Sequence, residues 1–128
     1  MAIENPTDIA GAAAALTAAR PKYKCSLPET SRGIGDPKIV ILQPISLGEE
    51  RMASKAAEAT GNLAYECLKH SVVEADGVKI AWDAGGKDLF LDRLSPKCRD
   101  LLLRAYAAIH IPKEKETEDF LANMSQIV

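Results

Sequence analysis

The sequence predicts an α+β fold that is mainly helical, with three main helices, a short strand and a β-hairpin that follow an extended N-terminal arm. Three observations predict it. Apolar residues recur at helical spacing in three stretches, the β-branched run KIVIL (38–42) is typical of a buried strand, and an Asp-Gly pair at 76–77 separates two alternating runs. The length of 128 residues fits one domain with a modest core.

Residues 1–35 differ from the rest of the chain and are expected to form the extended arm, with residues 36–128 as the compact helical domain. The stretch 8–19 is rich in alanine, which favours a helix but offers too little side-chain area to bury. Proline and glycine then interrupt the chain repeatedly, although YKCSL (23–27) reads as one short strand. We therefore expect the arm to be held by another chain.

The compact domain is expected to begin with the strand 38–42, which Pro44 closes. Ser46 and Glu49 then have the spacing of a capping box, so a helix should start there and run over about 47–70. Gly61 weakens this helix by roughly 1 kcal/mol relative to alanine. Its predicted buried stripe consists of Met52, Ala56, Ala59, Leu63 and Cys67, flanked by Ala53, Ala64 and Leu68.

The pattern changes from helical to alternating after Ser71, and Asp76-Gly77 supplies the positive backbone angles of a type I′ turn. A hairpin centred on this pair is therefore predicted. The segment 83–87 (DAGGK) reads as a loop, and LFLDRL (89–94) reads as a short amphipathic helix.

Two further helices are predicted in the last third of the chain. Ser95 and Pro96 are a strong opening for a helix over 95–110, because serine caps and proline fits the first turn. A final helix over 114–126 follows Pro112. The predicted buried stripe of the first is Cys98, Leu101, Leu102, Ala105 and Ile109, and the apolar face of the second is Phe120, Leu121, Met124 and Ile127.

Composition excludes several classes of function. The net charge is −2, from 16 basic and 18 acidic residues, so we expect no nucleic-acid partner. No apolar stretch approaches the roughly 20 residues of a membrane span, and the N-terminus lacks the basic start of a signal peptide. Three scattered cysteines fit a reducing cytoplasm better than a disulfide framework.

Signals for catalysis are weak. The segment DAGGKD (83–88) lacks the spacing and the terminal Gly-Lys-Ser/Thr of a phosphate-binding loop. Cys67, His70, Cys98 and His110 make a four-ligand metal site conceivable, but both cysteines fall on apolar stripes, where cysteine packs as a small hydrophobe. The two histidines fall near helix ends, where they interact with the helix C-terminus. We expect no enzyme activity, no cofactor and no metal.

A series of landmarks carries a resemblance to a known family. They are LPET (27–30), the strand followed by ISLGEERMASKAAE (45–58), VVEADGVKI (72–80), and the run from LSPK (94–97) through ETEDFL (116–121). In this order they resemble the small tail assembly chaperone-like proteins of tailed bacteriophages, especially those with long contractile tails. The resemblance covers roughly residues 23–122. The alanine-rich segment before Tyr23 departs from the pattern.

The resemblance implies a non-enzymatic role in the host cytoplasm, namely binding the aggregation-prone tape-measure protein and delivering it to tail-tube subunits. From the N-terminal arm and the lack of a long apolar stretch, we also expect a homo- or hetero-oligomer with no membrane partner. Short amphipathic helices with small-residue faces suit such a role, because they can hold a partner helix in a groove. The candidate partner-binding residues are Ala12, Leu16, Tyr23, Phe120, Leu121 and Met124.

Two alternatives stay open at this point. The first alternative is a structural component of the virion at the neck, tail or baseplate, where the N-terminal arm would lie between neighbouring subunits. The other is a helical regulatory DNA-binding protein, which the near-neutral charge disfavours.

Overall fold

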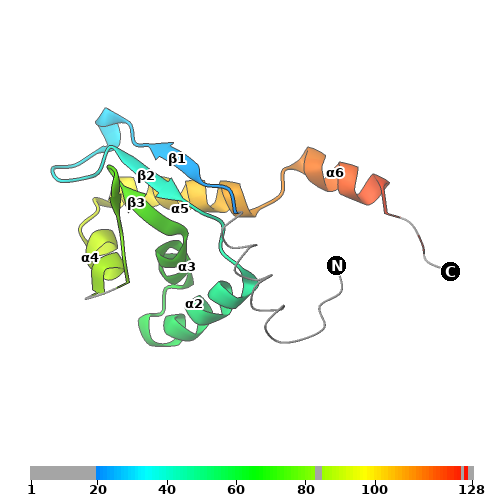
Figure 1. Ribbon diagram of the computed structural model, residues 1–128, viewed down its shortest axis with the longest axis horizontal. Coiled ribbons are helices and arrows are strands. Elements are labelled where there is room, and N and C mark those ends of the chain that lie inside the picture. Colours follow the sequence, from blue (N-terminus) through cyan, green and yellow to red (C-terminus); the bar gives the residue numbers. More distant parts are fainter. Residues whose placement is uncertain (1–19, 83–84, 125, 127–128) are drawn as a thin grey trace.

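The computed structural model describes residues 20–82, 85–124 and 126, and it shows a four-stranded antiparallel sheet with helices against it (Figure 1). The strands lie in chain order across the sheet: β1 (Tyr23–Ser26), β2 (Ile39–Leu42), β3 (Val72–Ala75) and β4 (Val78–Lys79). The helices are α2 (Leu47–Thr60), α3 (Leu63–Ser71), α4 (Gly86–Asp92), α5 (Pro96–His110) and α6 (Glu114–Ala122), with a 3-10 turn at Glu29–Ser31. The predicted α+β class is confirmed.

The core lies between one face of the sheet and helices α3, α4 and α5. Because successive residues of a strand point to opposite faces, Val40 and Leu42 of β2 are fully buried while Ile39 and Ile41 are only partly so. Beyond these two, the buried residues of the core are Leu27, Leu68, Val72, Leu91, Leu94, Cys98 and Leu102.

The predicted hairpin is confirmed. Asp76 and Gly77 both have positive φ values, 49° and 82°, and Ala75 pairs with Val78 across the two-residue turn, as a type I′ turn requires. The Asp76 carboxylate also accepts hydrogen bonds from the backbone N–H groups of Lys38 and Ile39, with Oδ1 at 3.0 and 2.9 Å. The turn thereby fixes the start of β2.

The predicted helix over 47–70 is two helices, α2 and α3. The capping box of Ser46 and Glu49 opens α2 as predicted, but Gly61 ends it with a left-handed backbone at φ 71°. Asn62 then caps α3, since its side-chain oxygen accepts the N–H of Tyr65 at 3.1 Å. The prediction of a single continuous helix was wrong because glycine in the left-handed conformation commonly ends a helix.

The serine cap and first-turn proline of α5 are also confirmed, with the Ser95 hydroxyl accepting the N–H of Cys98. Cys98 and Leu102 are buried as predicted. The remaining members of the predicted stripe, Leu101, Ala105 and Ile109, are partly buried and pack against the edge of the core.

The expected boundary at residue 35 between an arm and a compact domain needs one correction. Residues 20–35 are part of the fold, because β1 pairs with β2 in the register Cys25↔Val40 and Leu27 belongs to the core. The first 19 residues, including the predicted arm helix, lie outside the described residues.

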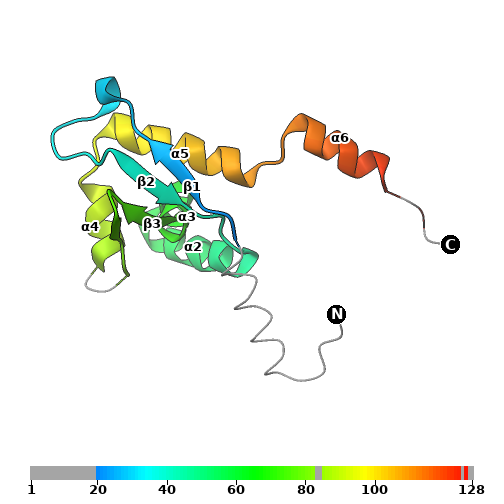
Figure 2. The same ribbon diagram turned by 45° about the horizontal axis from the view of Figure 1, so that its top comes forward.

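Helix α6 is not part of the compact body. It contains no buried residue, and two views show it beyond the end of α5, away from the sheet (Figures 1 and 2). It ends at Ala122, short of the predicted residue 126. In the described part of the chain, none of the helices has the length and apolarity needed to cross a membrane.

Candidate functional site

A cleft opens between α2, α3 and Trp82, which lies in the segment between the hairpin and α4. The volume of this cleft is about 450 Å³. We call it the α2–α3 cleft. It is lined by Glu49, Met52, Ala56, Glu66, Lys69, His70 and Trp82.

The apolar side of the α2–α3 cleft is the stripe of α2 that the sequence predicts to be buried. Met52 is 62% exposed, and Ala56 and Ala59 are exposed as well, whereas Ala53 is the one described residue of α2 that is buried. The prediction was wrong because α2 packs mainly against one other element, α3. This contact buries only the small side chain of Ala53 and leaves the rest of the predicted stripe uncovered. An apolar stripe is therefore left facing outward.

The polar side of the cleft contains buried charges. Lys69 Nζ lies 2.9 Å from Glu66 Oε2 and 2.6 Å from Asp88 Oδ1. Burial by itself lowers the pKa of Lys69, but its hydrogen bonds to Asp88 and Glu66 outweigh this and raise the pKa above its ordinary value. Lys69 is therefore a permanent cation in this network.

Glu66 is only 2% exposed, and its second oxygen, Oε1, is buried with no hydrogen-bond partner among the described residues. An unpaired buried acceptor costs on the order of 1–3 kcal/mol. Glu66 Oε1 is therefore a buried acceptor in the cleft lining whose hydrogen-bonding capacity is unused among the described atoms.

Trp82 lines the cleft and contacts His70 and Lys87 through its ring. Its ring centroid lies 4.7 Å from that of His70, and Lys87 Nζ lies 4.7 Å above its ring. Burial lowers the pKa of His70 despite the nearby Glu49 carboxylate, so His70 is neutral at physiological pH. Burial also lowers the pKa of Lys87.

Several polar groups in and beside this cleft are paired with one another. The Tyr65 hydroxyl donates to Asp92 and Asp88, and burial together with those carboxylates raises its pKa well above the usual range. Glu49 is held by Ser46 and Arg20, and in spite of burial those contacts lower its pKa. None of these contacts pairs a nucleophile with a base in the way catalysis needs.

The cysteines and histidines considered as metal ligands have other roles. Cys67 and Cys98 are buried, and burial with a nearby Asp36 raises the pKa of Cys98 to about 11. His110 ends α5 as predicted, with Nδ1 2.7 Å from the Tyr106 carbonyl while Nε2 accepts the Ile45 N–H at 2.9 Å. The described residues contain no cluster of three or more ligands suited to a metal ion.

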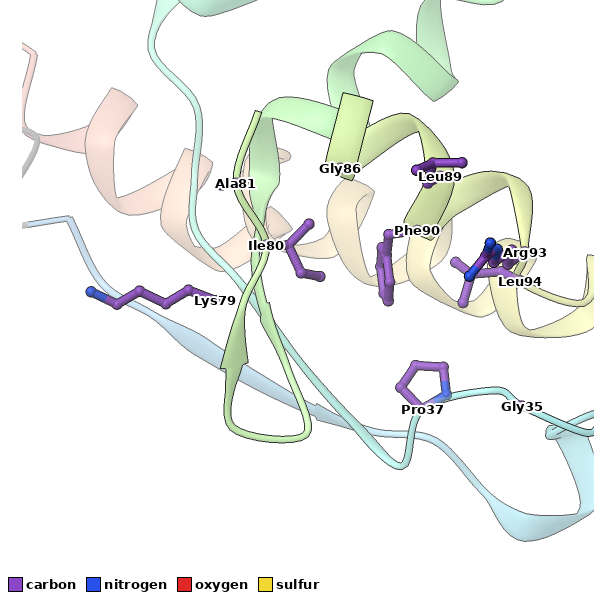
Figure 3. Close-up of a pocket in the computed structure, with 10 residues that line it drawn as sticks. All are labelled: Gly35, Pro37, Lys79, Ile80, Ala81, Gly86, Leu89, Phe90, Arg93 and Leu94. Atoms are coloured by element: carbon purple, nitrogen blue, oxygen red, sulfur yellow. The ribbon is translucent and has the colours of Figure 1, made fainter. Parts of the chain in front are cut away.

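A second recess, of about 380 Å³, lies between the outgoing arm of the hairpin and α4 (Figure 3). We call it the hairpin–α4 groove. Gly86 lies close to the Ala81 carbonyl oxygen. A Cβ atom at position 86 would be only 2.5 Å from that oxygen, so a larger residue would clash with it. The groove is lined by Gly35, Pro37, Lys79, Ile80, Ala81, Gly86, Leu89, Phe90, Arg93 and Leu94.

The structure describes four of the six predicted partner-binding residues. Ala12 and Leu16 lie outside the described residues, and Tyr23 is an exposed residue of edge strand β1 beside the connection from α5 to α6. Phe120 and Leu121 are 70% and 53% exposed on α6, and Met124 just beyond its end is 70% exposed.

The sequence did not predict the α2–α3 cleft or the hairpin–α4 groove. Met52 and Ala56 were singled out, but as residues of the buried stripe of a helix. Glu66 and Lys69, three residues apart on one helix, were a usable signal for an ion pair. No local signal in the sequence places Glu66 and Lys69 in the same cleft as Trp82, because this arrangement depends on how α3 lies relative to the segment before α4.

Comparison with known proteins finds no match: no family model fits the chain, and neither a curated protein nor a solved structure matches it.

Proposed function

We propose that this protein is a non-enzymatic morphogenesis factor of a bacteriophage tail, which binds the tape-measure or tail-tube protein in the host cytoplasm during assembly. The observation that carries the proposal is the outward apolar stripe of α2, where Met52 and Ala56 line the α2–α3 cleft. The landmarks of the sequence that resemble tail assembly chaperones support the same role.

The cleft suits a helical segment of another protein. Small and flexible side chains, Ala56 and Met52, allow a partner helix to approach closely, and methionine adapts to different apolar partners. Trp82 offers a large apolar surface at the other side of the cleft.

The decisive test uses the phage that carries this gene. Inactivating the gene should abolish tails while heads still form, as seen by electron microscopy of lysates. An assembly factor should also be absent or scarce in purified particles analysed by mass spectrometry. A fixed copy number in mature particles would instead support a structural component of the neck, tail or baseplate.

Complementation with matched variants tests the cleft itself. Met52→Glu places a charge on the apolar side of the cleft, and Ser54→Glu places the same charge on an exposed position of α2 away from it. We expect Met52→Glu to lose tail production and the control to retain it. Full activity of a folded Met52→Glu protein would contradict this site.

A further inference from the structure

Helix α6 is an acidic amphipathic helix without a surface to pack on. It carries four acidic residues against one lysine, and Phe120 and Leu121 are exposed on it. With Met124 these residues fall on one side of a helical projection. A short helix of this composition is marginal in water unless its apolar side is covered.

The hairpin–α4 groove has the complementary character. Its floor is apolar, and Figure 3 shows Ile80 and Phe90 between Lys79 on one side and Arg93 on the other. Both charged residues in its lining are basic and exposed, and none of the described residues that line it is acidic. It therefore matches an acidic helix with aromatic and aliphatic anchors in both charge and polarity.

The α6 of the same chain does not reach this groove. The groove includes Leu94 at the start of α5, whereas α6 follows the end of α5, and the 15 residues between span roughly 22 Å. Residues 111–113 lead from the end of α5 into α6, which continues away from the sheet, and Phe120 lies about 9 Å along α6 from its first residue. Figures 1 and 2 accordingly show α4 and α6 at opposite ends of α5.

We propose that α6 of one copy docks in the hairpin–α4 groove of a second copy, so that the protein associates head to tail. Phe120 and Leu121 cover Ile80 and Phe90, and the acidic residues of α6 face Lys79 and Arg93. Because the two surfaces differ, the interface is heterologous, and a dimer retains one unused groove on one copy and one unused α6 on the other, so association can continue beyond two copies. This self-association is independent of the tail-binding role, since it requires only the chain itself.

Sedimentation velocity of the purified full chain over a concentration series tests the proposal. We expect association that weakens with added salt, since charge pairs contribute to it. Phe120→Asp should weaken association by about tenfold or more, and Ala122→Asp, on the opposite side of the same helix, should not. A chain that stays monomeric at all concentrations, or an equal effect of both variants, would overturn the proposal.

The groove is tested with Lys79→Glu/Arg93→Glu, matched by Lys97→Glu/Arg99→Glu on exposed positions of α5 outside the groove. Circular dichroism first confirms that each variant is folded. The groove variant and Phe120→Asp should each be monomeric alone, but mixed they should form a one-to-one dimer that grows no further, because only one intact interface remains. Failure of the mixture to dimerise, or a groove variant that still associates, would refute a head-to-tail contact between these two surfaces.

Discussion

Asp36 and Ser95, 59 residues apart in sequence, are joined by two hydrogen bonds: the Asp36 carboxylate accepts the backbone N–H of Ser95 at 2.9 Å and also its hydroxyl. Asp36 accepts the N–H of Gly33 as well, at 2.6 Å. The same Ser95 hydroxyl caps α5. One carboxylate therefore ties the loop before β2 to the start of the central core helix.

This link predicts an acid-sensitive contribution to stability. Burial tends to raise the pKa of Asp36, but the hydrogen bonds from Ser95 and Gly33 outweigh it, so the pKa lies below its ordinary value. The contribution is present above the unfolded-state pKa near 4 and is lost as the pH falls through the lower folded-state pKa. Asp36→Asn should lower the free energy of unfolding by about 1–2 kcal/mol at pH 7, with the deficit shrinking below pH 4.

Urea unfolding at several pH values measures this deficit. Asp100→Asn is the control, because Asp100 pairs with Arg104 only on the exposed face of α5 and should cost less than about 0.5 kcal/mol. A deficit for Asp36→Asn that did not change between pH 7 and pH 3 would contradict the role of the ionised carboxylate.

Gly61→Ala distinguishes two helices from one. In a continuous helix over 47–70 this substitution would stabilise the protein by up to about 1 kcal/mol. With φ at 71°, alanine is strained in the left-handed region, and we expect a loss of about 1–2 kcal/mol. Thermal unfolding followed by circular dichroism gives the sign, and Gly48→Ala, where an added Cβ has room and the backbone is helical, should be neutral or stabilising.

Leu102→Asp should unfold the protein, because Leu102 is fully buried in the core and an unpaired charge there is not compensated. Leu121→Asp introduces the same charge on exposed α6 and should leave the thermal midpoint of the monomer nearly unchanged. Differential scanning fluorimetry at low protein concentration compares the two. A Leu102→Asp variant with an unaltered midpoint would show that this face of α5 is not part of the core.

Deleting residues 1–19 should leave the domain folded yet weaken assembly. Among the described residues, the core cluster and the residues packed against it lie between Cys25 and Ile109, so the deletion removes none of these members. The deletion retains Arg20, which donates to the Pro44 carbonyl and pairs with Glu49. Circular dichroism and tail production in complementation are the measurements; normal tail production would rule out an assembly role for this segment.

The features that the sequence determined by itself are local. The capping box of Ser46 and Glu49, the cap at Ser95 and the turn at Asp76-Gly77 each form within a few residues, so the residue types that make the hydrogen bonds or allow the backbone angles are adjacent in the chain. Their outcome does not depend on what packs around them.

Only the tertiary structure decided which apolar surfaces became core. The stripe of α2 has the same helical spacing as that of α5, yet α5 buries Leu102 against the sheet while Met52 stays exposed. Likewise, Leu27 joined the core because β1 pairs with β2, and Glu66 and Lys69 were buried beside Trp82. Periodicity defines an apolar face, but burial depends on the area that distant elements offer to cover it, and the described elements leave the apolar sides of α2 and α6 exposed.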